Sequence, residues 1–155
     1  MRGTALVLRR RTAAVALAFA FVWLALSAAA QGSENFKARL APVPLEASMR
    51  ATVAGTGSAT AVLTGTKLSV SGTFSGLKSP ATTARVYQGQ VIGVRGSSIF
   101  DLTVTPAASG SISGSFSGSF DLTAAQAESL RQGKFYIQID SEKARDGNLW
   151  GWLGH

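Results

Sequence analysis

Hydrophobic and polar residues alternate through the serine-rich stretch SGSISGSFSGSFDL, residues 109–122. Ile112, Phe116, Phe120 and Leu122 share one parity with three glycines, while six serines and an aspartate share the other. Side chains of a strand point alternately to its two faces, so this pattern predicts a strand with one buried face and one face in water. A flexible Gly/Ser linker is the alternative, but such linkers carry no regularly spaced large apolar residues.

The same alternation recurs in KLSVSGTFSGL, residues 67–77, where glycines again share the parity of the large apolar residues. These glycines leave room for an aromatic ring of a neighbouring strand. Further strands are predicted at NFKARLAP (35–42), ATAVLT (59–64), ARVYQGQVIGVRG (84–96, broken by glycines), SIFDLTVTP (98–106), KFYIQID (134–140) and LWGWL (149–153). KSPATT (78–83) and SEKARDGN (141–148) are predicted as loops.

One short helix is predicted over AAQAESLRQ, residues 124–132. Thr123 and Gln126 have the spacing of a capping box, the segment is rich in helix-forming residues, and Gly133 suits the position that follows a helix. Many short strands, frequent glycine turns and a single short helix predict an all-β protein, specifically a β-sandwich.

The first 30 residues are predicted to be a signal peptide and not part of the fold. MRGTALVLRRRTAA is basic and without acids, VALAFAFVWLALSAAA is apolar, and Ala28 and Ala30 suit a cleavage site before Gln31. An uncleaved membrane anchor is the alternative, and it would be the only contact with a membrane. The signal peptide predicts a periplasmic or extracellular location, an oxidising compartment that the chain, with no cysteine, tolerates without forming disulfides. Residues 31–35 are then a short N-terminal arm before a single domain at 36–155.

The net charge of +7 overstates how basic the exported part is. Four of the 15 basic residues precede residue 31 and all eight acids follow it, which leaves eleven bases against eight acids, a net charge of +3. Lys and Arg do not cluster there, so no nucleic-acid partner is expected.

Catalytic chemistry is not indicated either. The chain has no cysteine nucleophile, its only histidine is His155 at the C-terminus, and the glycine-rich run GQVIGVRG lacks the lysine of a phosphate-binding loop. No enzyme, no catalytic residue and no cofactor are therefore predicted.

The order of motifs resembles the CHRD domain, the module found in chordin and in bacterial secreted proteins, over about residues 36–153. The resemblance rests on FKARLAP, KLSVSGTFSGLKSPATTA, LTAAQAESLRQGKFYIQI and DGNLWGWL. It implies an immunoglobulin-like antiparallel β-sandwich. Family members carry His-x-His where this chain has Arg85-Val86-Tyr87, a histidine where it has Asp140, and Gly-Glu-Ile-Arg-Gly-Gln-Leu where it has GNLWGWL (147–153). Without those histidines, no metal site is expected.

Strand parity assigns the residues around these substitutions to two faces. One parity, expected in the core, comprises Val86, Ile137, Ile139, Leu149 and Leu153; the other, expected outside, comprises Arg85, Tyr87, Tyr136, Gln138, Asp140, Trp150 and Trp152. If the strands are neighbours as the resemblance implies, Arg85 pairs with Asp140. The candidate binding residues are therefore Arg85, Tyr87, Tyr136, Asp140, Trp150 and Trp152, with a protein or glycan as the partner. The alternative is that the two tryptophans pack beneath a loop.

The sequence thus predicts a secreted or periplasmic, non-enzymatic module that binds a protein or surface partner. Two alternatives stay open: a structural envelope protein without a specific ligand, and a metal-handling protein with altered ligands. A small outer-membrane barrel is a weaker reading, because serine- and threonine-rich faces do not make an apolar lipid-facing band.

Overall fold

A computed structural model describes residues 32–44 and 46–155, and the predicted signal peptide and its cleavage point lie outside these residues. Residues 32–155 form one compact unit. Within the described part of the chain, no helix has both the length and the apolar character needed to cross a bilayer.

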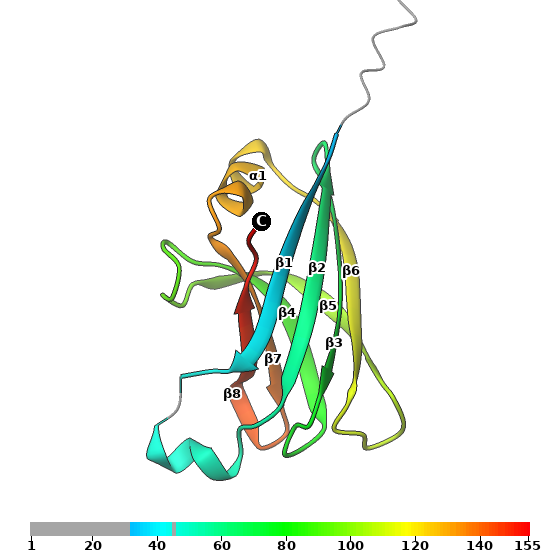
Figure 1. Ribbon diagram of the computed structural model, residues 1–155, viewed down its shortest axis with the longest axis vertical. Coiled ribbons are helices and arrows are strands. Elements are labelled where there is room, and N and C mark those ends of the chain that lie inside the picture. The colour runs from blue at the N-terminus through cyan, green and yellow to red at the C-terminus, as the bar shows by residue number, and fades with distance from the viewer. Residues whose placement is uncertain (1–31, 45) are drawn as a thin grey trace, which may run out of the picture. The chain divides into compact units, whose positions relative to one another are not determined.

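Eight strands and one α-helix make up the described fold, with a 3₁₀ helix between the first two strands (Figure 1). The strands are β1 (Ser33–Pro42), β2 (Thr56–Thr64), β3 (Lys67–Ser75), β4 (Ala81–Gln88), β5 (Ser97–Pro106), β6 (Gly114–Asp121), β7 (Phe135–Ser141) and β8 (Ala144–Trp152). The α-helix is α1 (Ala124–Arg131) and the 3₁₀ helix is η1 (Ala47–Ala51). The predicted all-β class with one short helix is confirmed.

The strands form one closed antiparallel barrel in the order β1-β2-β3-β6-β5-β4-β7-β8, and not the predicted immunoglobulin-like sandwich of two open sheets. Two strands close it. Residues 33–40 of β1 pair with β2, and Ala41 and Pro42 then pair with β8. Residues 97–102 of β5 pair with β4, and residues 103–106 pair with β6. Strands β1 and β5 therefore each pair with a neighbour on both sides. No strand edge is left open where the β2-β3-β6 half of the barrel meets the β4-β7-β8 half.

Apolar side chains fill the interior of the barrel, as expected when eight strands leave just enough room for side chains. The alternating faces of β1, β2 and β3 place the buried residues inside and Ser, Thr, Lys and Arg outside. The largest fully buried apolar side chains are Phe36, Leu40, Leu63, Leu68, Phe116, Leu130, Phe135, Ile137, Ile139, Leu149 and Leu153. The predicted inward position of the β4, β7 and β8 aliphatic residues is therefore confirmed.

Glycine makes room for aromatic rings in this interior, as the sequence pattern predicts. Gly72 lies opposite Phe116 on the neighbouring strand, and a Cβ at Gly72 would overlap the Phe116 ring. Gly114 lies opposite Phe74 in the same way, with 2.9 Å between its ideal Cβ position and the ring. Each pair of a small and a large residue therefore fills one level of the barrel.

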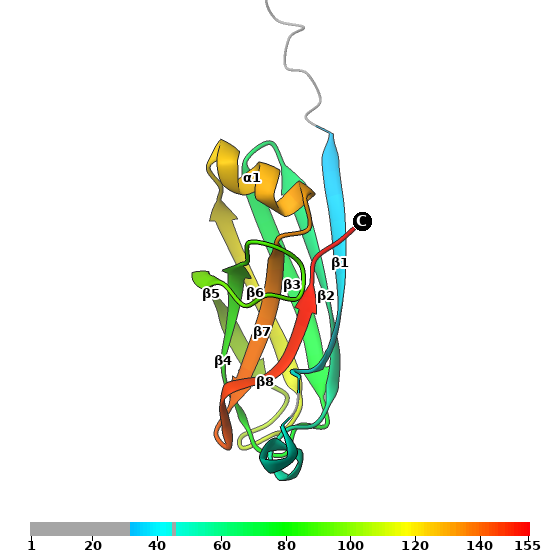
Figure 2. The same cartoon turned by 90° about the vertical axis from the view of Figure 1, so that its left-hand side faces the viewer.

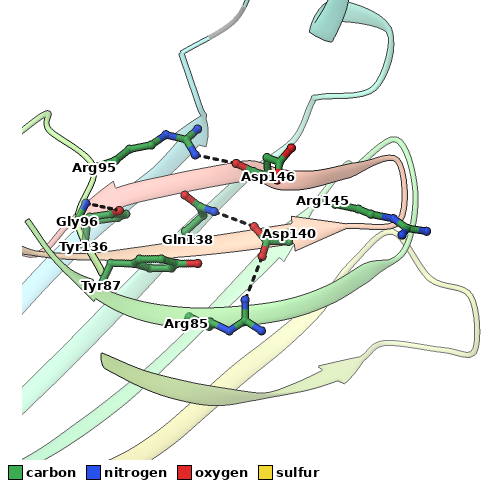
Figure 3. A pocket seen from close by; sticks show the side chains of 9 residues that line it. All are labelled: Arg85, Tyr87, Arg95, Gly96, Tyr136, Gln138, Asp140, Arg145 and Asp146. Carbon is green, nitrogen blue, oxygen red and sulfur yellow. Dashed lines mark hydrogen bonds and ion pairs between the residues drawn. The ribbon is translucent and has the colours of Figure 1, made fainter. Parts of the chain in front are cut away.

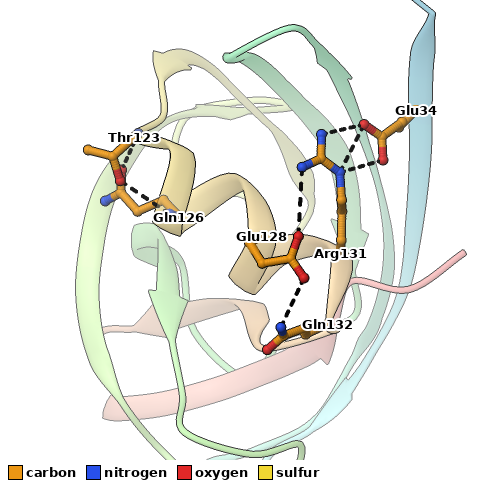
Figure 4. A network of polar contacts seen from close by, with 6 residues as sticks. All are labelled: Glu34, Thr123, Gln126, Glu128, Arg131 and Gln132. Atoms are coloured by element: carbon orange, nitrogen blue, oxygen red, sulfur yellow. Dashed lines mark hydrogen bonds and ion pairs between the residues drawn. The ribbon is translucent and has the colours of Figure 1, made fainter.

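Helix α1 lies across one end of the barrel, while η1 lies at the opposite end (Figures 1 and 2). The predicted capping box is confirmed: the Gln126 amide donates to Thr123 Oγ1, and the Thr123 amide donates to Gln126 Oε1. Gly133 follows the helix with a φ of 71°. At this C-terminal end of the helix, Arg131 makes a bidentate ion pair with Glu34 of β1 (Figure 4), which lowers the pKa of Glu34.

Several local predictions differ from the structure. Strand β4 begins at Ala81, inside the predicted loop 78–83, and ends at Gln88, so residues 89–96 form a loop in place of the predicted glycine-broken strand. The serine-rich strand begins only at Gly114, so Ile112 lies in the preceding loop and is exposed. The last strand begins at Ala144, inside the predicted polar loop, because Asn148 is fully buried and its side-chain amide bonds both the N–H and the C=O of Ala54. The first strand begins at Ser33, within the predicted N-terminal arm.

We expect Gly72→Ala to lower the free energy of unfolding by about 1–3 kcal/mol, because the added methyl group overlaps both the Phe116 ring and the Ser58 carbonyl and must displace them. Chemical denaturation of residues 32–155 measures the change. Gly154→Ala is the matched control, since nothing lies within 4 Å of its ideal Cβ position. Equal stability of the two variants would contradict the close packing at Gly72.

Candidate functional site

All six predicted binding residues lie on the outer surface formed by β4, β7 and β8, which we call the outer face. Strand register arranges the outer face in rows. Tyr87, Tyr136 and Trp152 are direct neighbours across the three strands. Arg85, Gln138 and Trp150 form the next row, followed by Thr83 opposite Asp140. The sequence therefore predicted correctly that these strands are neighbours and that these side chains share one face.

The outer face is not an open platform, because other parts of the chain cover its central strand. Only 1% of the surface of Tyr136 is exposed, and 5% of that of Asp140. The segment 89–96 between β4 and β5 covers Tyr136, with the Gly96 amide donating to the Tyr136 hydroxyl at 3.1 Å. This burial raises the pKa of Tyr136 above its ordinary value, so its hydroxyl ionises only at a higher pH than that of an exposed tyrosine.

The two tryptophans are partly buried. They are neither a fully exposed binding face nor fully packed beneath a loop, the two arrangements that the sequence left open. Trp150 packs against a small apolar cluster of Val43, Val53 and Ala144, beneath the segment that contains η1. Trp152 lies against Tyr136, with 4.6 Å between ring centroids, and its Nε1 is buried without a hydrogen-bond partner among the described residues. Tyr87 stacks on Tyr136 with 5.0 Å between ring centroids, and Trp150 contacts both Tyr136 and Trp152 edge-on. The four aromatic side chains of the outer face therefore form one cluster.

Asp140 is the centre of a polar network next to this cluster (Figure 3). Its Oδ1 accepts a hydrogen bond from Gln138 Nε2 at 2.8 Å, and its Oδ2 accepts one from Thr83 Oγ1 at 2.8 Å. The predicted ion pair with Arg85 is present, with Nη1 3.6 Å from Oδ2. These two hydrogen bonds and one ion pair offset part of the cost of removing the Asp140 side chain from water.

Arg85 makes its shorter ion pair with a residue that the sequence reasoning did not connect to it. Its Nε donates to Asp101 Oδ1 of β5 at 2.8 Å, and this hydrogen bond raises the pKa of the guanidinium. Asp101 is largely exposed, whereas Asp140 is buried. Arg85 is therefore held between an exposed and a buried carboxylate, with its outer edge towards solvent.

A pocket of about 280 Å³ opens over this network. Five residues of the outer face line it together with two residues of segment 89–96 and two at the start of β8; the full lining is Arg85, Tyr87, Arg95, Gly96, Tyr136, Gln138, Asp140, Arg145 and Asp146. Arg95 spans its edge by donating from Nη1 to the backbone oxygen of Asp146 at 2.8 Å. Arg85 and Arg145 also line an adjoining hollow of about 340 Å³, which extends towards Glu142.

Arg95, Arg145 and Asp146 are site residues that the sequence analysis missed. They belong to segments predicted as a glycine-broken strand and a polar loop, so parity along the strands gave no signal for them. Trp150 and Trp152, which were predicted to be part of the binding face, do not line the pocket but support it through Tyr136. Among residues 32–44 and 46–155, no group of three or more His, Cys, Asp or Glu side chains is placed to hold a metal ion.

We expect Asp140→Ala to destabilise the protein by about 2–4 kcal/mol, since it leaves the Gln138 amide and the nearby Arg85 charge without their buried acceptor. Denaturant unfolding of residues 32–155 measures this loss. Asp101→Ala is the control, because it also removes a partner of Arg85 but from an exposed position, and it should leave stability close to wild type. If both variants lose the same stability, the network does not depend on burial of Asp140.

Comparison with known proteins identifies the family. A family model of the CHRD domain matches residues 36–153, the greater part of the chain, and the chain therefore belongs to the CHRD domain family. No curated protein and no solved structure matches it. CHRD domains are in general non-catalytic and occur in extracellular or secreted proteins.

Proposed function

We propose that this CHRD domain protein is an exported, non-enzymatic binding module, and that it holds a protein or glycan partner at the pocket on the outer face. Family membership supports a non-catalytic module. Export is supported by the basic and then apolar pattern of residues 1–30, which is typical of a signal peptide.

The observation that carries this proposal is the pre-built network around Asp140. A binding site needs polar groups that are fixed in place before the partner arrives, because ordering them on binding costs affinity. Asp140 fixes both Gln138 and Arg85, and Asp101 fixes Arg85 from the other side. By contrast, the outward positions of β3 and β6 carry mainly serine and threonine.

The chemistry of the pocket indicates the kind of group that it would bind. Arg85, Arg95 and Arg145 present guanidinium donors at its rim, and Tyr87 adds a partly exposed ring. Guanidinium groups recognise carboxylates in bidentate geometry, and aromatic rings provide contact area at a low cost in side-chain entropy. An acidic saccharide and an acidic peptide both offer such groups, so both belong in the test.

We expect residues 32–155 to bind either oligogalacturonate or a peptide rich in Asp and Glu, with Arg85→Ala weakening the affinity at least tenfold. Isothermal titration calorimetry against both probes, and against a neutral malto-oligosaccharide, measures the affinity and selects the class. Lys67→Ala is the matched control, because Lys67 is an exposed cation that pairs with Asp121 outside the pocket.

Two results would contradict the proposal. The first is that neither acidic probe binds at millimolar concentration, which would favour a structural envelope protein without a specific ligand. The second is that Arg85→Ala and Lys67→Ala weaken binding equally, which would mean that general charge and not the pocket attracts the probe.

We expect the chain to be exported and cleaved before Gln31. Expression of the full-length protein in a bacterial host, followed by fractionation and N-terminal sequencing, tests this expectation. A mature protein beginning at Gln31 in the periplasm or the medium would support it. Retention of Met1 on membrane-bound protein would show that residues 1–30 serve as an anchor.

A further inference from the structure

Segment 89–96, which connects β4 to β5, carries an unusual apolar surface that we call the aliphatic loop. Val91, Ile92 and Val94 expose 56%, 66% and 50% of their surface. Among the described residues only one other large hydrophobic side chain, Ile112, is exposed to this degree. Three such residues in one short loop are not explained by the scattered exposure that is normal on protein surfaces.

The aliphatic loop is held in an outward position by its backbone. At its base, the Gly89 amide donates to the Lys134 carbonyl at 2.8 Å and the Gly96 amide donates to the Tyr136 hydroxyl at 3.1 Å. Across its tip, the Val94 amide donates to the Val91 carbonyl at 3.2 Å. The loop projects from the side of the barrel (Figure 1) and lies in front of β7 in Figure 2. The apolar side chains are thus displayed to solvent by an ordered turn.

The aliphatic loop itself carries positive charge and no acidic residue. Arg95 lies in the loop and Lys134 at its base, and no Asp or Glu occurs from Gly89 to Phe100. Neither cation forms an ion pair with any described residue; the side-chain contact of Arg95 is to a backbone oxygen. A small aliphatic tip beside unpaired cations is complementary to a surface that is apolar inside and anionic outside.

The size and composition of the loop decide between a protein and a lipid partner. Stable protein interfaces bury about 800 Å² on each side and concentrate their affinity in aromatic residues and arginine, whereas this tip offers two valines and an isoleucine. A bilayer requires no matching shape, and it gains from each buried methylene group together with each cation near anionic headgroups. We propose that the aliphatic loop docks the folded domain onto an anionic lipid bilayer, independently of residues 1–30.

The experiment is flotation of residues 32–155 with two kinds of vesicle, one of phosphatidylcholine and one of phosphatidylcholine with phosphatidylglycerol. This piece contains the whole barrel and lacks the apolar N-terminal segment, which would itself bind lipid. We expect binding to the anionic vesicles, at least a tenfold lower partition coefficient for the double variant Ile92→Ser/Val94→Ser, and wild-type binding for Ile112→Ser. Ile112 is the matched control because it is an exposed aliphatic residue of a different loop.

Circular dichroism and thermal unfolding establish that each variant is folded, which we expect because all three substituted side chains are exposed. Lys134→Gln and raised salt should each weaken binding to the anionic vesicles several-fold. Failure of the wild type to float with either vesicle would overturn the proposal, as would equal loss of binding in Ile112→Ser. If the wild type forms dimers in analytical ultracentrifugation and the double variant does not, with no flotation of either, the loop instead contacts a second copy.

Discussion

The barrel closes because β1 and β5 each change partner along their length. The first part of β1 belongs to the β2 side and its last two residues to β8, while β5 changes from β4 to β6 at Thr103. Without these changes of partner, the same eight strands would form two stacked sheets with four exposed edges. The closed interior that results sets the positions of the core, of α1 at one end and of the strands that carry the site.

Closure of the barrel also explains why the candidate site lies on the outer face of β4, β7 and β8. The interior is filled by apolar side chains at every level, so polar groups can gather only on the outer surface or in the loops. On the outer face, segment 89–96 and the segment containing η1 add a second layer over β7 and β8. Segment 89–96 lowers the exposure of Tyr136, and together with Arg145 and Asp146 of β8 it converts a flat strand surface into a pocket lined by charged residues.

The sequence predicted the parts of this structure that depend on local periodicity. Alternation along β1, β3 and β7 gave the correct inward residues, and the spacing of Thr123 and Gln126 gave the helix start. Barrel closure depends on a register between distant strands, which alternation does not encode. The same limit applies to the site: parity placed Arg85 and Asp140 on one face, but only the path of segment 89–96 and the early start of β8 bring Arg95 and Asp146 beside them. The early start of β8 was missed because the buried Asn148 reads as a polar loop residue until its partner Ala54 is known.

The two-sided burial of β7 has a consequence for how this protein can diverge. Every residue from Phe135 to Ser141 is buried, so the strand offers no position where a change of side chain meets only water. In β3 and β6, by contrast, the outward serines and threonines are mostly exposed and free of such constraint. Random mutagenesis followed by selection for folded protein would therefore leave β7 nearly invariant on both of its faces while β3 and β6 drift on one. Invariance of Asp140 or Tyr136 in such a selection would reflect the burial of β7 on both faces, and so would not by itself indicate ligand recognition.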